Sequence, residues 1–208
     1  MEQIKNIYCI GRNYVEHVKE LNNQMPKYPV VFNKPTHSLI QANGKEIAIP
    51  GHRGNVHYEV EIVLHLKEDY DENKQLNELI QQMYIGLDLT LRDIQDELKE
   101  KQYPWLIAKG FKNSAILSQP ISFPGIKKLK ETPFSLTING ETVQKGKAKQ
   151  MIFDIDTQLR YINENLSLKK GDIIFTGTPP GVNALKDGDQ LFIYFGSKQV
   201  GSCSIKFI

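Results

Sequence analysis

The stretch His57-Tyr-Glu-Val-Glu-Ile-Val-Leu-His-Leu66 decides the fold, because every even-numbered position in it is apolar. A period of two is typical of a β-strand. At about 3.3 Å of rise per residue, Glu59 and Glu61 project from one face with about 7 Å between their α-carbons. Both carboxylates can then converge on one ion. The same alternation also fits a half-buried strand whose polar face is solvated.

Strand patterns recur along the chain, and Gly, Pro or Asn-Gly ends each of them. The clearest covers residues 134–144, where Asn139-Gly140 separates two alternating segments and favours the positive φ angles of a type I′ hairpin. The other predicted strands are residues 29–32, 47–49, 58–66, 173–177, 191–195 and 200–207.

Helical spacing of apolar residues is confined to four short segments, residues 14–21, 76–83, 90–101 and 159–166. We expect these segments to be short helices beside sheets, in a mixed, β-rich α+β fold. No linker or low-complexity segment interrupts residues 1–208, which indicates a single domain.

The composition excludes several classes of protein. The 208 residues are 40% hydrophobic and 24% charged, as in one soluble globular domain. The net charge is only +2 and the lysines are scattered, so no nucleic-acid partner is expected. No apolar run approaches the roughly 20 residues of a membrane span, and residues 1–5 lack a secretory signal pattern. We therefore expect a cytoplasmic protein with no membrane partner.

Two charged residues lie in apolar surroundings and are candidates for a site. Asp88 ends an apolar run before a predicted helix, where it is either a ligand or a carboxylate that stabilises the helix N-terminus. Lys109 follows Leu-Ile-Ala and precedes Gly110. It either has a buried acidic partner or extends along the surface to solvent.

A third candidate is the pair His17 and Glu20, which are three apart on a predicted helix and can touch. A carboxylate-held imidazole can take a proton from water, although the same spacing is common in surface pairs. The fourth is the segment 171–181, Gly-Asp-Ile-Ile-Phe-Thr-Gly-Thr-Pro-Pro-Gly, a strand that breaks into a stiff turn with two hydroxyls. A plain turn has the same pattern.

Taken together, six blocks in order resemble the fumarylacetoacetate hydrolase family, specifically its short single-domain members. The blocks span nearly the whole chain: Ile10-Gly-Arg-Asn-Tyr14 with His17 and Glu20, Val31-Phe-Asn-Lys-Pro35, Tyr58-Glu-Val-Glu61, Gly86-Leu-Asp-Leu-Thr-Leu-Arg-Asp-Ile-Gln95, Ala108-Lys-Gly-Phe111, and Gly171–Gly181. The resemblance implies a β-sandwich roll with short flanking helices.

The resemblance also implies a set of site residues. These are three metal carboxylates, Glu59, Glu61 and Asp88; a water-activating pair, His17 and Glu20; a lysine beside the metal, Lys109; and two contacts to substrate oxygens, Gln95 and Thr178. Ligands that are all oxygen suit Mg²⁺, or Mn²⁺, rather than Zn²⁺. Three carboxylates, a divalent ion and a protonated Lys109 sum to about zero, so an anionic 2-oxoacid that chelates the ion is not repelled.

Two kinds of reaction follow from the resemblance. In the first, His17 and Glu20 activate a water that cleaves an acylpyruvate or a related diketo acid, and pyruvate enolate leaves. In the second, the same site decarboxylates oxaloacetate or isomerises a muconate-derived 2-oxoacid. In both, positive charge at the ion and Lys109, with the Thr178 hydroxyl, stabilises a developing enolate.

Further expectations rest on position alone. Residues 1–45 are expected to carry a lid, with Arg12 near the substrate. Residues 112–114 are Lys-Asn-Ser where many family members carry an Asp and a Thr, which predicts altered local specificity. We expect a homodimer, because pairing protects exposed strand edges. Two alternatives stay open: a non-catalytic protein that binds a metal and an organic acid, and a zinc hydrolase that uses His57 with Glu59 and Glu61.

Overall fold

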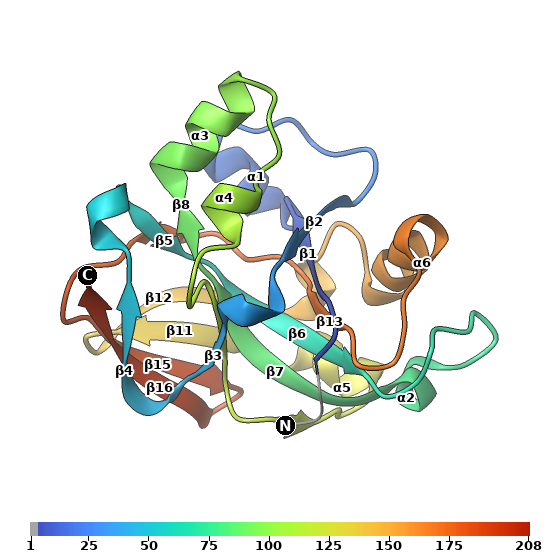
Figure 1. Cartoon of the computed structure of the whole chain (residues 1–208). Helices are drawn as coiled ribbons and strands as arrows, with labels where there is room; N and C mark the ends of the chain where they lie inside the picture. The colour runs from blue at the N-terminus through green and yellow to red at the C-terminus, as the bar shows by residue number, and fades with distance from the viewer. Residues whose placement is uncertain (1–3) are drawn as a thin grey trace.

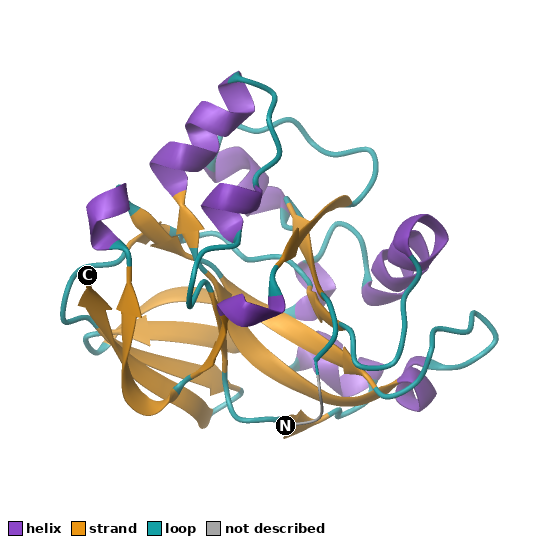
Figure 2. Ribbon diagram, viewed as in Figure 1, coloured by secondary structure: helices purple, strands orange, loops and turns teal. Residues whose placement is uncertain are grey.

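Three β-sheets form the body of the protein in the computed structural model, which describes residues 4–208 (Figures 1 and 2). The largest sheet runs in the order β2 (Val30–Lys34), β1 (Ile7–Gly11), β13 (Ile173–Phe175), β6 (Val60–Leu66), β7 (Ile80–Asp88), β9 (Ala115–Leu117) and β3 (Leu39–Gln41), with β10 (Ile121–Ser122) also paired to β7. The strand-rich architecture confirms the predicted fold class.

The two smaller sheets pack beside the large one. One has the order β12 (Glu141–Gly146), β11 (Phe134–Ile138), β15 (Gln190–Phe195), β16 (Lys198–Phe207) and β4 (Asn43–Ile49). The other joins β14 (Asn183–Ala184), β5 (Val56–Tyr58) and β8 (Thr90–Leu91). The predicted hairpin is confirmed as β11 and β12, because Asn139 and Gly140 have φ angles of +51° and +88°.

Short helices lie around the sheets (Figure 2). They are α1 (Val15–Glu20), α2 (Leu76–Leu79), α3 (Arg92–Glu100), α4 (Leu106–Lys109), α5 (Ile126–Glu131) and α6 (Ile155–Leu166). Single 3₁₀ turns occur at Thr36–Ser38, Gly51–Arg53 and Ala148–Gln150. Helices α1, α3 and α4 gather over one end of the large sheet, near β5 and β8 (Figure 1).

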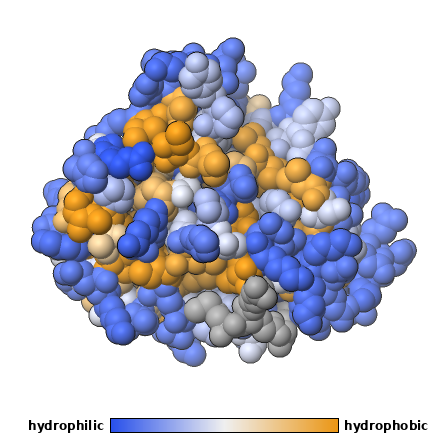
Figure 3. Space-filling model, viewed as in Figure 1, coloured by the Kyte–Doolittle hydropathy of each residue, from blue (hydrophilic) through white to orange (hydrophobic). Residues whose placement is uncertain are grey.

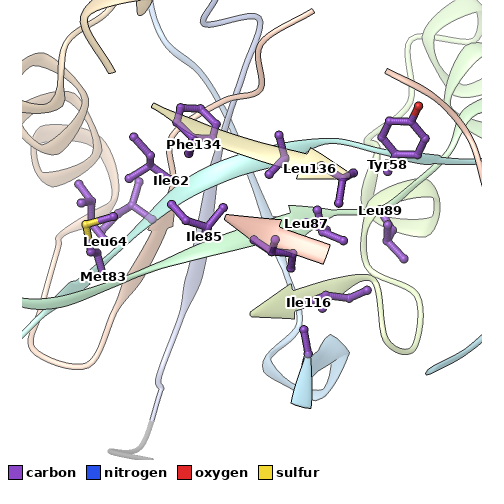
Figure 4. Packing of buried hydrophobic residues seen from close by; sticks show 14 of the residues in the cluster. Tyr58, Ile62, Leu64, Met83, Ile85, Leu87, Leu89, Ile116, Phe134 and Leu136 are labelled. Atoms are coloured by element: carbon purple, nitrogen blue, oxygen red, sulfur yellow. The ribbon is translucent and has the colours of Figure 1, made fainter. Parts of the chain in front are cut away.

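The central strand β6 is buried on both faces, which corrects the interpretation of a half-solvated strand. Its even positions, among them Ile62 and Leu64, pack with Phe134 and Leu136 of β11 in the main core (Figure 4). Its odd position Val63 packs in a second core, with residues of β1 and β13. Full burial of such a side chain stabilises the fold by about 1.5–3 kcal/mol. Glu59 and Glu61 therefore lie in the interior.

The predicted helix over residues 76–83 is wrong beyond its first turn. Helix α2 ends at Leu79, and Ile80 begins β7, which pairs antiparallel with β6. Apolar residues spaced three and four apart fit a helix and a fully buried strand equally well, and here the pairing with β6 decides between them. The consequence is that Asp88 is the last residue of β7, while α3 begins only at Arg92.

Gly86 in β7 permits the close packing of three strands behind the site. A methyl group on Gly86 would lie 2.8 Å from atoms of the Phe175 and Val63 side chains and 3.0 Å from the carbonyl oxygen of Ile116. We therefore expect Gly86→Ala to lower the free energy of unfolding by about 1–3 kcal/mol, measured by urea denaturation. The control is Gly11→Ala, where the nearest atoms lie at 3.7 Å. Equal stability of the two variants would contradict this packing.

Candidate active site

Three buried carboxylates converge where β6 begins and β7 ends. Glu59 lies at the break between β5 and β6, Glu61 is in β6, and Asp88 closes β7. The backbone amide of Asp88 donates to the carbonyl of Glu59 at 2.9 Å, which fixes the two strand ends side by side. One oxygen from each carboxylate lies within 4.8 Å of the others, and all three residues are buried. The residues expected to bind metal are thus brought together.

Lys109 lies between two of these carboxylates. Its Nζ is 2.8 Å from Glu59 Oε2 and 2.8 Å from Asp88 Oδ2, and the side chain is buried. The sequence left open whether Lys109 has a buried acidic partner or extends to solvent, and the structure shows the buried partner. Burial alone lowers the pKa of Lys109, but the negative charges of Asp88 and Glu59 more than offset this effect and raise it. Lys109 is therefore a permanent cation.

The structure adds two cations that the sequence analysis did not place at the site. Lys34 Nζ is 2.7 Å from Asp88 Oδ1 and also donates to the backbone carbonyls of Leu89 and Lys109. A guanidinium nitrogen of Arg92 is 2.5 Å from Glu59 Oε1. Lys34 and Arg92 lie in two of the family-like blocks, Val31–Pro35 and Gly86–Gln95. The blocks therefore indicated that both residues matter, but the sequence did not indicate which carboxylate each cation contacts.

The carboxylates differ in how their charge is balanced. Burial raises the pKa of Glu59, but Lys109 and Arg92 outweigh it and hold the pKa far below its usual range. Burial, Asp88 and Glu59 together raise the pKa of Glu61 well above its usual range. Within residues 4–208, Glu61 has no Lys or Arg in ion-pair contact; one of its oxygens accepts a hydrogen bond from the Gly177 amide at 2.7 Å.

These properties fit a divalent cation. Asp88 Oδ1 is buried and accepts no hydrogen bond in the described part of the chain, although it lies 2.7 Å from Lys34 Nζ. Glu61 lacks a countercharge, and the group supplies only oxygen atoms. Oxygen ligands suit Mg²⁺ or Mn²⁺. His57 is not in the group; its Nδ1 accepts a 3.4 Å hydrogen bond from Arg92 instead, which disfavours the zinc alternative.

His17 and Glu20 form the expected pair, and it is not an ordinary surface pair. The distance from His17 Nδ1 to Glu20 Oε2 is 3.3 Å, and His17 is only 5% exposed. Burial lowers the pKa of His17, although Glu59 and Glu20 act in the opposite direction. The imidazole is therefore neutral at pH 7 and can accept a proton.

The three predicted substrate contacts all line the same cavity. Arg12 lies over the Trp105 ring at 5.9 Å and has a positive φ of 59°. Gln95 Oε1 accepts a 2.6 Å hydrogen bond from Arg92. The Thr178 hydroxyl donates to the carbonyl of Val60 at 2.9 Å, so its proton is already engaged within the protein.

The cavity lies between the carboxylates and α1, and its volume is about 30 Å³. This space is enough for a metal ion or a water molecule. Lys112, Asn113 and Ser114 are not among the residues that line it. The Ser114 hydroxyl instead donates to the carbonyl of Lys109 at 2.7 Å, at the end of α4. The residues that depart from the family pattern therefore lie outside the cavity lining.

A buried cluster of three carboxylates beside a histidine with a lowered pKa is an arrangement that could hold a divalent cation next to a base. The family model for the fumarylacetoacetate (FAA) hydrolase C-terminal region matches residues 6–207. The chain belongs to the fumarylacetoacetate hydrolase family and is an enzyme of it, as the resemblance predicted.

Similar proteins act on small 2-oxoacids. The chain is 37% identical over 199 residues to oxaloacetate tautomerase YcgM of Escherichia coli, with 92% of this chain and 89% of that protein covered. It is 36% identical over 189 residues to the mitochondrial oxaloacetate tautomerase FAHD1 of Rattus norvegicus, with 90% and 85% covered. The crystal structure of fumarylpyruvate hydrolase from Pseudomonas aeruginosa, in complex with Mn²⁺ and pyruvate, superposes with a TM-score of 0.91 at 28% identity, covering 100% of this chain and 93% of that one.

Across residues 4–208, none of the helices has the length and apolar character needed to cross a membrane.

The contact between His17 and Glu20 should affect the pKa of the His17 imidazole. Because the Glu20 carboxylate stabilises the protonated imidazole, Glu20→Gln should lower the pKa of His17 further below its usual value. The measurement is an NMR titration of the His17 ring in metal-free protein. Glu16→Gln is the matched control, since Glu16 lies on the same helix and pairs with exposed Lys19. A His17 pKa that rises in the Glu20 variant would contradict the arrangement.

Proposed function

We propose that the protein is a divalent-metal-dependent enzyme that interconverts the keto and enol forms of oxaloacetate or a closely similar dianionic 2-oxoacid. One observation carries the proposal: a neutral histidine shares a small cavity with three carboxylates, and three cations surround those carboxylates. The names of the E. coli and rat relatives support oxaloacetate over the acylpyruvates that the sequence alone favoured.

The charge of the site supports a dianion. Glu59, Glu61 and Asp88 contribute three negative charges, and Lys34, Lys109 and Arg92 contribute three positive ones. The sum of about zero expected from the sequence included the three carboxylates, a divalent ion and a single cation, Lys109. With all three cations the protein groups cancel, so a bound divalent ion leaves about +2. A substrate with two carboxylates neutralises that charge, whereas a monoanion leaves half of it unbalanced.

The protein groups suit a proton transfer next to a carbonyl. A divalent ion held by Glu59, Glu61 and Asp88 would supply the positive charge that lowers the energy of an enolate. Neutral His17 takes the proton from the carbon beside the ketone, and Glu20 stabilises the imidazolium that forms. His17 then returns the proton to the enolate oxygen, which completes the conversion of ketone to enol. Lys109, held between Glu59 and Asp88, keeps a fixed positive charge beside the reacting atoms.

Hydrolysis of an acylpyruvate is a second candidate function. The Mn²⁺ and pyruvate complex of the Pseudomonas protein, a fumarylpyruvate hydrolase, favours it, because the two folds match over all of this chain and 93% of that one. His17 and Glu20 would then deprotonate a water that attacks the distal carbonyl. Acetylpyruvate and water would give acetate and pyruvate.

We also propose a cytosolic homodimer in which the N-terminal segment, residues 1–45, includes the lid. The lid is supported by Gly11, Arg12 and His17, which all line the cavity; residues 1–3 of this segment lie outside the described residues. A dimer is supported by hydrophobic residues gathered on the face that includes α4 (Figure 3), where Tyr103, Leu106 and Ile107 are exposed.

The metal assignment predicts the behaviour of Glu61→Gln. Loss of one carboxylate charge from the oxygen cluster should weaken Mn²⁺ binding by tenfold or more and reduce turnover in proportion. Isothermal titration calorimetry with Mn²⁺ measures the first effect, and the loss of enol absorbance from oxaloacetate measures the second. Glu46→Gln, an exposed substitution on β4, should change neither. Mn²⁺ affinity that is unchanged in the Glu61 variant would overturn the assignment.

A substrate panel separates the candidate reactions. Enol absorbance follows tautomerisation of oxaloacetate, pyruvate released from oxaloacetate follows decarboxylation, and pyruvate released from acetylpyruvate follows hydrolysis. We expect kcat/KM for tautomerisation to exceed the other two by at least tenfold, with His17→Ala abolishing it. If pyruvate release from acetylpyruvate is fastest instead, the second candidate is the function and the first is rejected.

A further inference from the structure

The strand β6 loses its partner beside the metal carboxylates. Strand β13 pairs with β6 only from Val63 to His65 and ends at Phe175. The Thr176 amide still donates to the carbonyl of Ile62 at 3.0 Å, and the chain then turns away. The backbone groups of Val60, which lies between Glu59 and Glu61, are therefore left without a strand partner on this side. Buried backbone groups of this kind must find other hydrogen bonds.

One side chain from a different sheet accepts the bond of the Val60 amide and also binds the turn that supplies the bond to the Val60 carbonyl. Gln144 of β12 is only 2% exposed. Its Oε1 accepts from the Val60 amide at 2.8 Å. Its Nε2 donates to the Thr178 hydroxyl at 2.9 Å and to the Pro179 carbonyl at 2.8 Å. The Thr178 hydroxyl in turn donates to the Val60 carbonyl. The Gln144 carboxamide thus joins the backbone between two metal carboxylates to the turn that follows β13.

That turn, residues 176–181, also packs closely on β12. A methyl group on Gly146 would lie 2.9 Å from the Pro179 ring, and one on Gly181 would overlap the carbonyl of Val143. Gly181 has a φ of +103°, a conformation that other residues rarely adopt. The second sheet therefore serves as the surface on which the turn is fixed.

Two amides of the turn reach the residues assigned to chemistry. The Gly177 amide donates to Glu61 Oε2 at 2.7 Å. The Gly181 amide donates to Glu20 Oε1 at 2.9 Å, while the other oxygen of Glu20 faces His17. A displacement of the turn would consequently move a metal carboxylate and the partner of the proposed base together.

We propose that Gln144 is a positioning residue, which acts through residues 176–181 to hold the carboxylates of Glu61 and Glu20 at the spacing that the reaction requires. The proposal rests on the proposed function for the role of Glu20, but its effect on the metal carboxylates is independent of the substrate. Gln144 touches neither the cavity nor the reacting atoms.

The test replaces Gln144 with methionine, which has nearly the same shape and lacks the carboxamide. Loss of hydrogen-bonding partners behind metal ligands typically weakens metal affinity or activity by 10–100-fold. We expect Gln144→Met to weaken Mn²⁺ binding, measured by calorimetry without substrate, by at least tenfold, and to reduce kcat while KM changes less. Hydrogen exchange at residues 176–181 should become faster.

Thr142→Val on the same strand is the control, since within residues 4–208 the Thr142 hydroxyl makes a single hydrogen bond, an exposed 3.5 Å contact with the Thr137 hydroxyl. Gln144→Asn, which keeps the carboxamide but is shorter, should give a smaller loss of Mn²⁺ affinity, and it serves as the test if the methionine variant does not fold.

The outcomes separate the two proposals. If a Gln144 variant folds and its melting temperature falls, but Mn²⁺ affinity and kcat stay within twofold of the wild type, Gln144 has only a structural role. That result overturns the proposal. If the wild type binds Mn²⁺ but turns over none of the substrates above, and the Gln144 variant still loses Mn²⁺ affinity, the positioning role stands and the proposed function fails.

Discussion

The structure depends on the burial of three carboxylates side by side, two of which, Glu59 and Asp88, are held by buried cations. Glu59, Glu61 and Asp88 lie within a few ångströms of one another in the interior, where an unpaired carboxylate is costly. Lys109 contacts two of them, and Lys34 and Arg92 each contact one. The three cations come from three separate elements, β2, α3 and α4, and all three must dock to bring them to the carboxylates. The site and the fold therefore form together.

Local patterns in the sequence identified the elements whose structure is decided locally. The alternation in residues 58–66 and the Asn139-Gly140 turn were sufficient, because strand period and turn conformation are properties of short segments. Residues 80–83 were misassigned because their pairing with β6 is a long-range interaction. Burial of both faces of β6 was missed for the same reason, since a strand does not reveal what lies on its polar side.

The site shows the same division between local and long-range information. The spacing of His17 and Glu20 follows from the geometry of one helix. That of Glu59 and Glu61 follows from an extended segment in which Glu59 lies at the break between β5 and β6. In the sequence, Asp88 and Lys109 are isolated candidates. Only the resemblance to the family assigns them to the same site as Glu59 and Glu61. No local pattern connects Lys34 or Gln144 with the site, because Lys34 meets Asp88 and Gln144 meets Val60 through contacts between residues far apart in the sequence. The family model matches residues 6–207, so the resemblance relates residues far apart in the sequence, which the periodicity of single segments cannot do.

Helix α1, which carries His17, has only six residues. A helix this short is unstable in water by itself, because too few hydrogen bonds offset the entropy lost when its first turn forms. Its conformation is therefore maintained by contacts beyond itself, including the bridge from Tyr14 to Met151 and the bond from Gly181 to Glu20. Because His17 lines the cavity, any event that detaches this helix enlarges the opening and at the same time removes the imidazole from the carboxylates.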